Sequence, residues 1–161
     1  MRRVVPAADL VIGTIYDVPA GLICRAGHPL LSRHAGQVPF EALLAYPIAS
    51  TPLSDEVARM LVARYGAVAD PARMTTLQCE EIASLIETVR QTDAIYLGIL
   101  GAARRELASG ELVALKVSPR FDAGARLGMV TLAGRTELPV MAVFRQFVSE
   151  QLASGKGQAD A

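Results

Sequence analysis

The sequence predicts an α/β domain in which short buried strands alternate with amphipathic helices. Apolar residues make up 52% of the 161 residues and charged residues 20%, which is typical of a globular chain. Residues 10–12 and 22–24 are continuous apolar runs, as expected for strands that are covered on both faces. Residues 79–90 instead carry apolar side chains at steps of three and four, the period of a helix. This alternation indicates a mainly parallel sheet with helices on its faces.

Prolines and glycines mark the element boundaries in the first half of the chain. A short helix should lie between Pro39 and Pro47, because a residue that precedes proline disfavours the helical conformation. A longer helix should end at Gly66. In order, the elements expected here are strands at 10–12 and 22–24, the short helix, a strand at 47–50 and a helix at 54–65.

The second half continues the same alternation. Gly110 closes the helix that follows the strand at 94–97, and the C-terminal helix at 138–152 has a clear apolar stripe. The tail at 154–161 is polar and rich in glycine, so we expect it to be disordered. The expected elements are a strand at 73–77, a helix at 79–90, a strand at 94–97, a helix through 107, strands at 112–117 and 126–132, and the helix at 138–152.

Charge, hydropathy and cysteine usage exclude several classes. Lys plus Arg equals Asp plus Glu at 16 each, so the chain lacks the basic surface that nucleic-acid binding requires. No apolar run approaches the roughly 20 residues of a membrane span, and the N-terminal apolar stretch is too short for a signal peptide. Cys24 and Cys79 are far apart in apolar contexts, which indicates reduced thiols of a cytosolic protein.

A candidate ligand site lies where one predicted strand leads into a helix. Ligands of parallel sheets bind at the carboxyl ends of the strands. Ser50, Thr51 and Pro52 occupy such a turn, with Ser54 as the expected N-cap of the next helix. Their hydroxyls and free backbone N–H groups suit a carboxylate. The alternative is that these hydroxyls only cap the helix, and the spacing alone favours this interpretation.

Gln78 and Gly98 lie at the next two strand ends, facing the same crevice. Gln78 offers a donor and an acceptor, and Gly98 allows a ligand to approach the backbone. Taken individually, each residue has a simpler explanation than ligand binding: Gln78 as an exposed polar residue, and Gly98 as part of a tight turn. His28 and His34 have no Cys or carboxylate at ligand spacing, so no metal site is expected. No catalytic constellation and no cofactor motif is recognised.

A series of short phrases, in a fixed order, resembles the effector-sensing half of LysR-type transcriptional regulators. The specificity lies in their order and spacing together. This resemblance implies a type II periplasmic-binding-protein-like fold in a cytoplasmic bacterial protein. The phrases are residues 9–13 (Asp-Leu-Val-Ile-Gly), 25–30 (Arg-Ala-Gly-His-Pro-Leu), 44–48 (Leu-Ala-Tyr-Pro-Ile), 84–97, 110–113 (Gly-Glu-Leu-Val) and the helix at 138–152.

The resemblance also implies two lobes. Residues 24–125 would form a complete second lobe, and residues 1–23 with 126–153 an incomplete first lobe. The first lobe and the helix-turn-helix of such regulators would begin upstream of Asp9, so the resemblance implies a truncated chain. The sequence departs from the family pattern after Val89, where Thr92, Ala94 and Ile95 replace a Gly-x-Gly-Ile phrase and Gly98-Ile99 replaces Leu-Pro.

The function implied is non-catalytic sensing of a small-molecule effector, with effector contacts at Ser50 and Thr51. With this resemblance, ligand binding and helix capping there are evenly supported. A carboxylate or aromatic acid is the expected effector class. DNA would be read only through a helix-turn-helix that this chain does not contain. A homo-oligomer is expected, because the incomplete lobe leaves a strand edge unpaired. The alternatives are a solute-binding protein of a transporter and, third, a small α/β enzyme.

Overall fold

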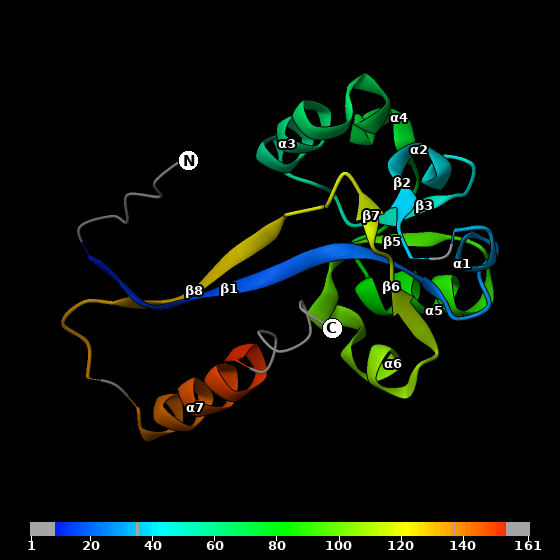
Figure 1. The fold of residues 1–161 in the computed structure, drawn as a ribbon. Coiled ribbons are helices and arrows are strands. Elements are labelled where there is room, and N and C mark those ends of the chain that lie inside the picture. The colour runs from blue at the N-terminus through cyan, green and yellow to red at the C-terminus, as the bar shows by residue number, and fades with distance from the viewer. Residues whose placement is uncertain (1–8, 35, 137, 154–161) are drawn as a thin grey trace. The chain divides into compact units, whose positions relative to one another are not determined.

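The computed structural model describes residues 9–34, 36–136 and 138–153. The chain divides into two compact units. Unit 2 is Ala20–Gly124, and the described residues of unit 1 are 9–19, 125–136 and 138–153. The long strand β1 (Leu10–Arg25) contributes its first part to unit 1 and its second part to unit 2 (Figure 1).

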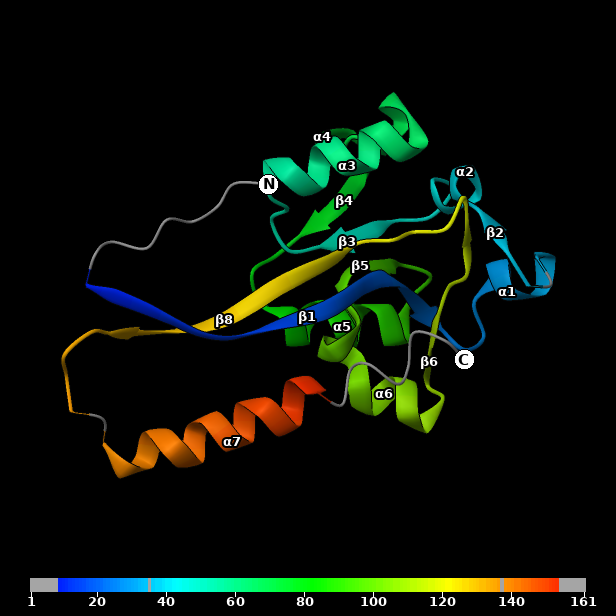
Figure 2. The same cartoon turned by 60° about the vertical axis from the view of Figure 1, so that its left-hand side comes forward.

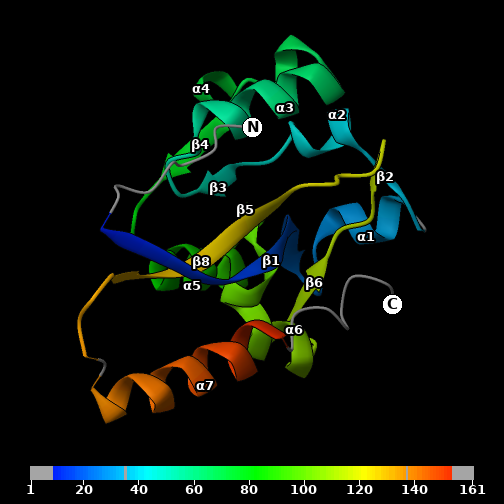
Figure 3. The same cartoon turned by 90° about the vertical axis from the view of Figure 1, so that its left-hand side faces the viewer.

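Unit 2 is an α/β layer structure with helices on both faces of a sheet. Figures 1, 2 and 3 show α3 and α4 on one face and α5 and α6 on the other. In chain order, its elements after β1 are α1 (Pro29–Arg33), β2 (Val38–Pro39), α2 (Phe40–Leu43), β3 (Ile48–Ser50), α3 (Asp55–Tyr65), η1 (Ala67–Ala69), α4 (Pro71–Met74), β4 (Thr75–Gln78), α5 (Ile82–Gln91), β5 (Ile95–Ile99), η2 (Leu100–Ala103), α6 (Arg104–Ser109), β6 (Leu112–Ala114) and β7 (Val117–Ser118).

The sheet has the strand order β4-β3-β5-β1-β6, with β8 paired to β1 beside this path. β3 runs parallel to both β4 and β5, whereas β1 is antiparallel to both β5 and β6. The short strands β2 and β7 pair in parallel as a separate two-stranded sheet. The prediction of a mainly parallel sheet is therefore correct only for β4, β3 and β5, because β1 enters beside β5 from the opposite direction.

Two apolar cores lie on the two faces of this sheet. Alternation along each strand divides the side chains between them, since successive side chains point to opposite faces. In β5, Ile95 and Leu97 join the core of α1, α2 and α3, whereas Tyr96 joins the core of α5 and α6. β3 divides in the same way at Ile48 and Ala49. The apolar run at 22–24 is continuous because both faces of the sheet are covered there. The same expectation is wrong for the run at 10–12, where Val11 and Ile12 are exposed.

Several element boundaries differ from the prediction. The runs at 10–12 and 22–24 belong to one strand, β1, because pairing with β8 and then with β5 keeps the intervening residues extended. Arg73 lies in α4 rather than in a strand, because Asp70 caps a short helix that Pro71 begins. The strand predicted at 112–117 is divided into β6 and β7. The short elements α1 and β2 were not predicted.

Unit 1 contains the first part of β1, most of β8 (Gly124–Leu132) and α7 (Pro139–Ala153). β8 pairs with β1, and the Ala133 N–H donates to the Asp9 carbonyl at 2.7 Å. The predicted strand at 126–132 and helix at 138–152 are confirmed within one or two residues. The predicted disordered tail at 154–161 lies outside the described residues, as do residues 1–8.

Candidate functional site

Ser50 is the last residue of β3, the middle strand of the three parallel ones. Its side chain is fully buried, and its hydroxyl has no hydrogen-bond partner among the residues that the structure describes. An unpaired buried hydroxyl costs about 1–3 kcal/mol by mutational measures. The Ser50 carbonyl is occupied, because it accepts from the Cys79 N–H at 3.3 Å. The Ser50 hydroxyl is therefore a buried polar group at the carboxyl end of a parallel strand.

Helix capping does not account for Ser50 and Thr51. The N-cap of α3 is Ser54, as predicted, and its hydroxyl accepts from the Val57 N–H at 3.4 Å. Asp55 and Glu56 follow in the first turn, where their charges complement the helix dipole. Thr51 is half-buried and Pro52 is exposed, both between β3 and that cap. The explanation that these hydroxyls merely cap the helix thus applies to Ser54 alone.

The sheet register brings Gln78 next to Ser50. The two residues are direct partners across the parallel pair β3 and β4, and both end their strands. Residues paired in register point to the same face of a sheet. Gln78 is exposed, so its side-chain amide is accessible to solvent beside the buried Ser50. The structure therefore places these two predicted residues together.

Gly98 lies inside β5, one residue beyond Leu97, which is the register partner of Ser50. It was predicted in a turn after the strand, but pairing with β1 (Gly21 opposite Gly98) extends β5 to Ile99. A Cβ at Gly98 would overlap the Tyr96 hydroxyl and would stand 2.9 Å from Tyr96 Cε1. Packing of the buried Tyr96 ring thus explains the glycine independently of any ligand.

His28 has a structural role in the turn before α1. It is buried; its Nδ1 accepts from the Leu30 N–H at 3.1 Å, and its Nε2 lies 3.1 Å from the Asp93 carbonyl. Arg25 contacts the Asp93 carboxylate beside it, through Nε at 2.9 Å and through a terminal nitrogen at 2.6 Å. These contacts join the turn after β1 to the turn before β5. Within the described ranges, no group of three or more His, Cys, Asp and Glu side chains is placed to hold a metal ion.

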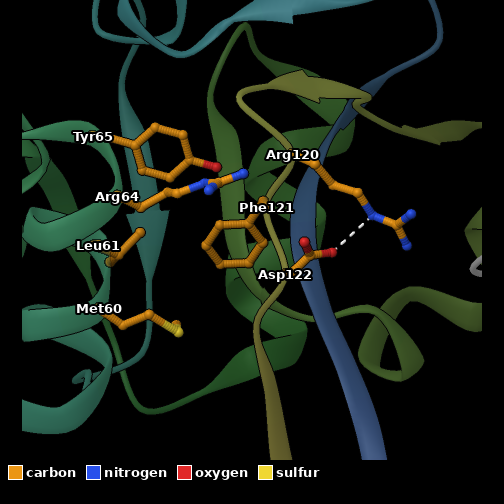
Figure 4. A pocket seen from close by; sticks show the side chains of 7 residues that line it. All are labelled: Met60, Leu61, Arg64, Tyr65, Arg120, Phe121 and Asp122. Atoms are coloured by element: carbon orange, nitrogen blue, oxygen red, sulfur yellow. Dashed lines mark ion pairs between the residues drawn. The ribbon is translucent and has the colours of Figure 1, made fainter.

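Three cavities in the described residues lie away from the predicted site residues. One of about 370 Å³ contains the ion pairs of Arg90 with Glu87 and Glu111. One of about 520 Å³ lies within unit 1. The third, of about 210 Å³, lies within unit 2 between α3 and residues 120–122 (Figure 4). This last cavity was not predicted from the sequence, because its two sides are about 55 residues apart along the chain and neither side carries a motif.

An α/β layer with polar groups at the carboxyl ends of adjacent parallel strands is typical of ligand-binding domains. Residues 1–153 match the LysR substrate binding domain family, and the chain belongs to this family. Its fold is of the type II periplasmic-binding-protein kind, as predicted, and it represents the effector-sensing part of LysR-type regulators. Within the described part of the chain, no helix is long and apolar enough to cross a bilayer.

Solved structures of regulators share this fold. The effector domain of the transcriptional regulator AmpR from Pseudomonas aeruginosa has a TM-score of 0.65 at 16% identity, over 96% of this chain and 72% of that one. The AmpR effector-binding domain from Citrobacter freundii has a TM-score of 0.64 at 15% identity, over 92% and 70%. The effector-binding domain of QuiR, solved with shikimate, has a TM-score of 0.55 at 14% identity, over 97% and 70%.

A curated relative is the SDS degradation transcriptional activation protein of Pseudomonas sp. (strain ATCC 19151). It is 29% identical over 144 residues. The match covers 89% of this chain and 46% of the relative, so the chain spans about half of that protein's length. These relatives are transcriptional regulators.

Proposed function

We propose that this chain senses a small organic anion through Ser50, Thr51, Pro52, Gln78 and Gly98. The observation that carries the proposal is the buried, unpaired Ser50 hydroxyl at the end of a parallel strand, in register with Gln78. Hydroxyl, amide and backbone N–H groups donate to carboxylate or sulfate oxygens. Gly98 is the weakest member of the set, because Tyr96 already explains it.

The class of effector is supported by the relatives. The QuiR domain was solved with shikimate, a small carboxylate. The curated relative is named for the degradation of SDS, an anionic amphiphile. Both are organic anions, the class of effector proposed for the strand ends.

We further propose that the chain binds an effector and catalyses no reaction, and that it does so in the cytoplasm. We also propose that it consists of one complete lobe and part of a second lobe. Unit 2 would be the complete second lobe, and the predicted boundaries at residues 24 and 125 stay predictions. An effector with different affinities for two lobe arrangements would shift their populations, and a DNA-binding dimer would respond to that shift. Because the chain carries 16 basic and 16 acidic residues, we expect no sequence-specific shift of DNA in a mobility assay at physiological salt.

Two neighbouring serines test the site. Ser50→Ala removes an unpaired buried hydroxyl, so it should leave stability unchanged or raise it, while weakening the binding of benzoate or shikimate about tenfold. Ser54→Ala removes the N-cap of α3, so it should cost about 1 kcal/mol of stability and leave binding unchanged. Calorimetric titration and urea unfolding measure the two effects.

Equal affinities of wild type and Ser50→Ala would exclude Ser50 from the site. Unchanged affinity in Thr51→Ala and Gln78→Ala would exclude those residues in turn. Binding of neither probe would contradict the carboxylate class.

A further inference from the structure

The cavity of about 210 Å³ in unit 2 combines an apolar floor with a cationic rim. The floor consists of Leu61, which is buried, and the partly exposed Met60 and Phe121. Arg64, Arg120 and Asp122 carry the charges around it. Ligand pockets are usually about 300–1,000 Å³, so this one suits a small ligand.

Two of its three charges are engaged with each other. Arg120 Nε lies 2.7 Å from an Asp122 carboxylate oxygen, and Figure 4 shows that pair on the side of Phe121 away from α3. None of the ion pairs found among the described residues includes Arg64. The rim therefore keeps one positive charge without a partner carboxylate.

Neighbouring groups hold Arg64 at the cavity. Figure 4 shows its side chain reaching toward the Tyr65 hydroxyl and the Phe121 ring. Tyr65 itself is fixed, because its hydroxyl donates to the Pro119 carbonyl at 2.8 Å and its ring stacks on Phe40 at 3.9 Å between centroids. Burial raises the pKa of Tyr65, and the adjacent Arg64 guanidinium opposes that rise. The guanidinium thus lies beside a neutral hydroxyl, with its remaining N–H groups available to an acceptor.

We propose that this cavity is a second ligand site, which binds a small organic monoanion with a short alkyl or single-ring body. Its head group contacts Arg64, and its apolar body covers Met60, Leu61 and Phe121. Guanidinium groups match the oxygens of carboxylate and sulfate groups, and hydrogen bonds to charged groups are the stronger ones. This inference does not rest on the proposed effector site at Ser50, because the two sites have no residue in common.

The site has a structural consequence for the segment that leaves unit 2. Residues 120–122 lie between β7 and β8, and β8 begins at Gly124, the last residue of unit 2. A ligand that contacts both α3 and Phe121 would hold this segment against the helix. Exchange of the backbone amides at 121 and 122 should then slow when the ligand binds.

Hexyl sulfate, used below its micelle concentration, is the test probe. Titration into the isotope-labelled chain of 161 residues should give saturable amide shifts at residues 60–65 and 119–122. Hexan-1-ol, the matched neutral compound, should bind at least tenfold more weakly. Arg64→Gln should weaken hexyl sulfate about tenfold, the expected loss of one charge-assisted contact. Phe121→Ala should weaken both compounds.

Arg59→Gln is the matched control, because Arg59 is an exposed arginine of the same helix that does not line the cavity. It should bind hexyl sulfate as the wild type does. Equal weakening in both arginine variants would reveal a nonspecific charge effect and would overturn the proposal. Equal binding of hexan-1-ol, shifts confined to residues 50–52 and 78, or no saturable shift would also overturn it. The dispersion of the amide spectrum shows that each variant is folded.

Discussion

The two units of this chain use apolar residues in opposite ways. In β3, β5 and the unit 2 part of β1, the apolar side chains alternate between two cores, and most of them are completely buried. In the described part of unit 1, Val18 is the one buried hydrophobic residue. The large apolar side chains exposed in unit 1 are Val11, Ile12, Ile15, Leu127, Val130, Leu132, Leu138, Val140, Val143, Phe144 and Phe147.

The same strand shows both behaviours. In the unit 2 part of β1, Leu22, Ile23 and Cys24 have β5 and β6 as neighbours and helices on both faces. In its unit 1 part, the strand pairs with β8, and Val11 and Ile15 remain about half exposed. A two-stranded ribbon alone is marginally stable in water. An apolar strand is therefore buried only where other layers cover it.

The largest expected effect is the difference between two phenylalanines. Phe40→Ala should destabilise the chain by about 3–5 kcal/mol, because Phe40 is 2% exposed and stacks on Tyr65. Phe144→Ala should change stability by no more than about 0.5 kcal/mol, because Phe144 is 49% exposed. Urea unfolding followed by circular dichroism measures both. Similar losses would show that unit 1 buries its aromatic residues in solution.

Self-association should depend on unit 1. We expect the chain to form a homo-oligomer through its exposed apolar surface and the edges of β1 and β8, since burying each ring contributes about 1.5–3 kcal/mol. Phe144→Gln together with Phe147→Gln should weaken association at least tenfold in sedimentation over a concentration series. Val68→Gln, at an equally exposed position of unit 2, should have little effect. A monomer at high micromolar concentration in the wild type would contradict this expectation.

Two strand glycines should respond differently to alanine. Gly98→Ala should cost about 1–3 kcal/mol, because its methyl group would overlap the buried Tyr96 ring. Gly128→Ala in β8 should be neutral or slightly stabilising, since a Cβ there would meet Ile12 and Ile15 at 3.6 Å, an ordinary contact. Thermal unfolding of both variants, and of the double variant Gly98→Ala/Tyr96→Leu, measures how far the cost at position 98 depends on the Tyr96 ring. A neutral Gly98→Ala would reject the packing explanation.

The smallest effect concerns the two thiols of unit 2. Burial raises the pKa of Cys24 to about 12 from its ordinary 9.0, with Arg25 opposing the rise and Asp93 adding to it. The folded state therefore favours the neutral thiol more strongly than the unfolded state does. The resulting contribution to the free energy of unfolding is fully present below pH 9 and is lost as the pH rises from about 9 toward 12. At pH 8 a thiol reagent should label the half-buried Cys79 first. Rapid labelling of both thiols in the folded chain would contradict the prediction that Cys79 reacts before Cys24.

The sequence by itself determined the class of fold and most of the elements. Apolar runs such as 22–24 and helical periods such as that of α5 depend on local spacing, and Gly66 and Gly110 end their helices with φ of 83° and 77°. The placement of Ser50 and Ser54 at a strand end and an N-cap follows from the same local rules.

Tertiary structure decided what depends on residues distant along the chain. The antiparallel entry of β1 beside β5, the register of Ser50 with Gln78 and the Tyr96 ring that requires Gly98 each follow from packing between elements. The cavity between Arg64 and Phe121 likewise exists only because α3 lies against residues 120–122. Local periodicity carries no information about such pairings, because it records how each segment divides polar from apolar residues and not which segment it will meet.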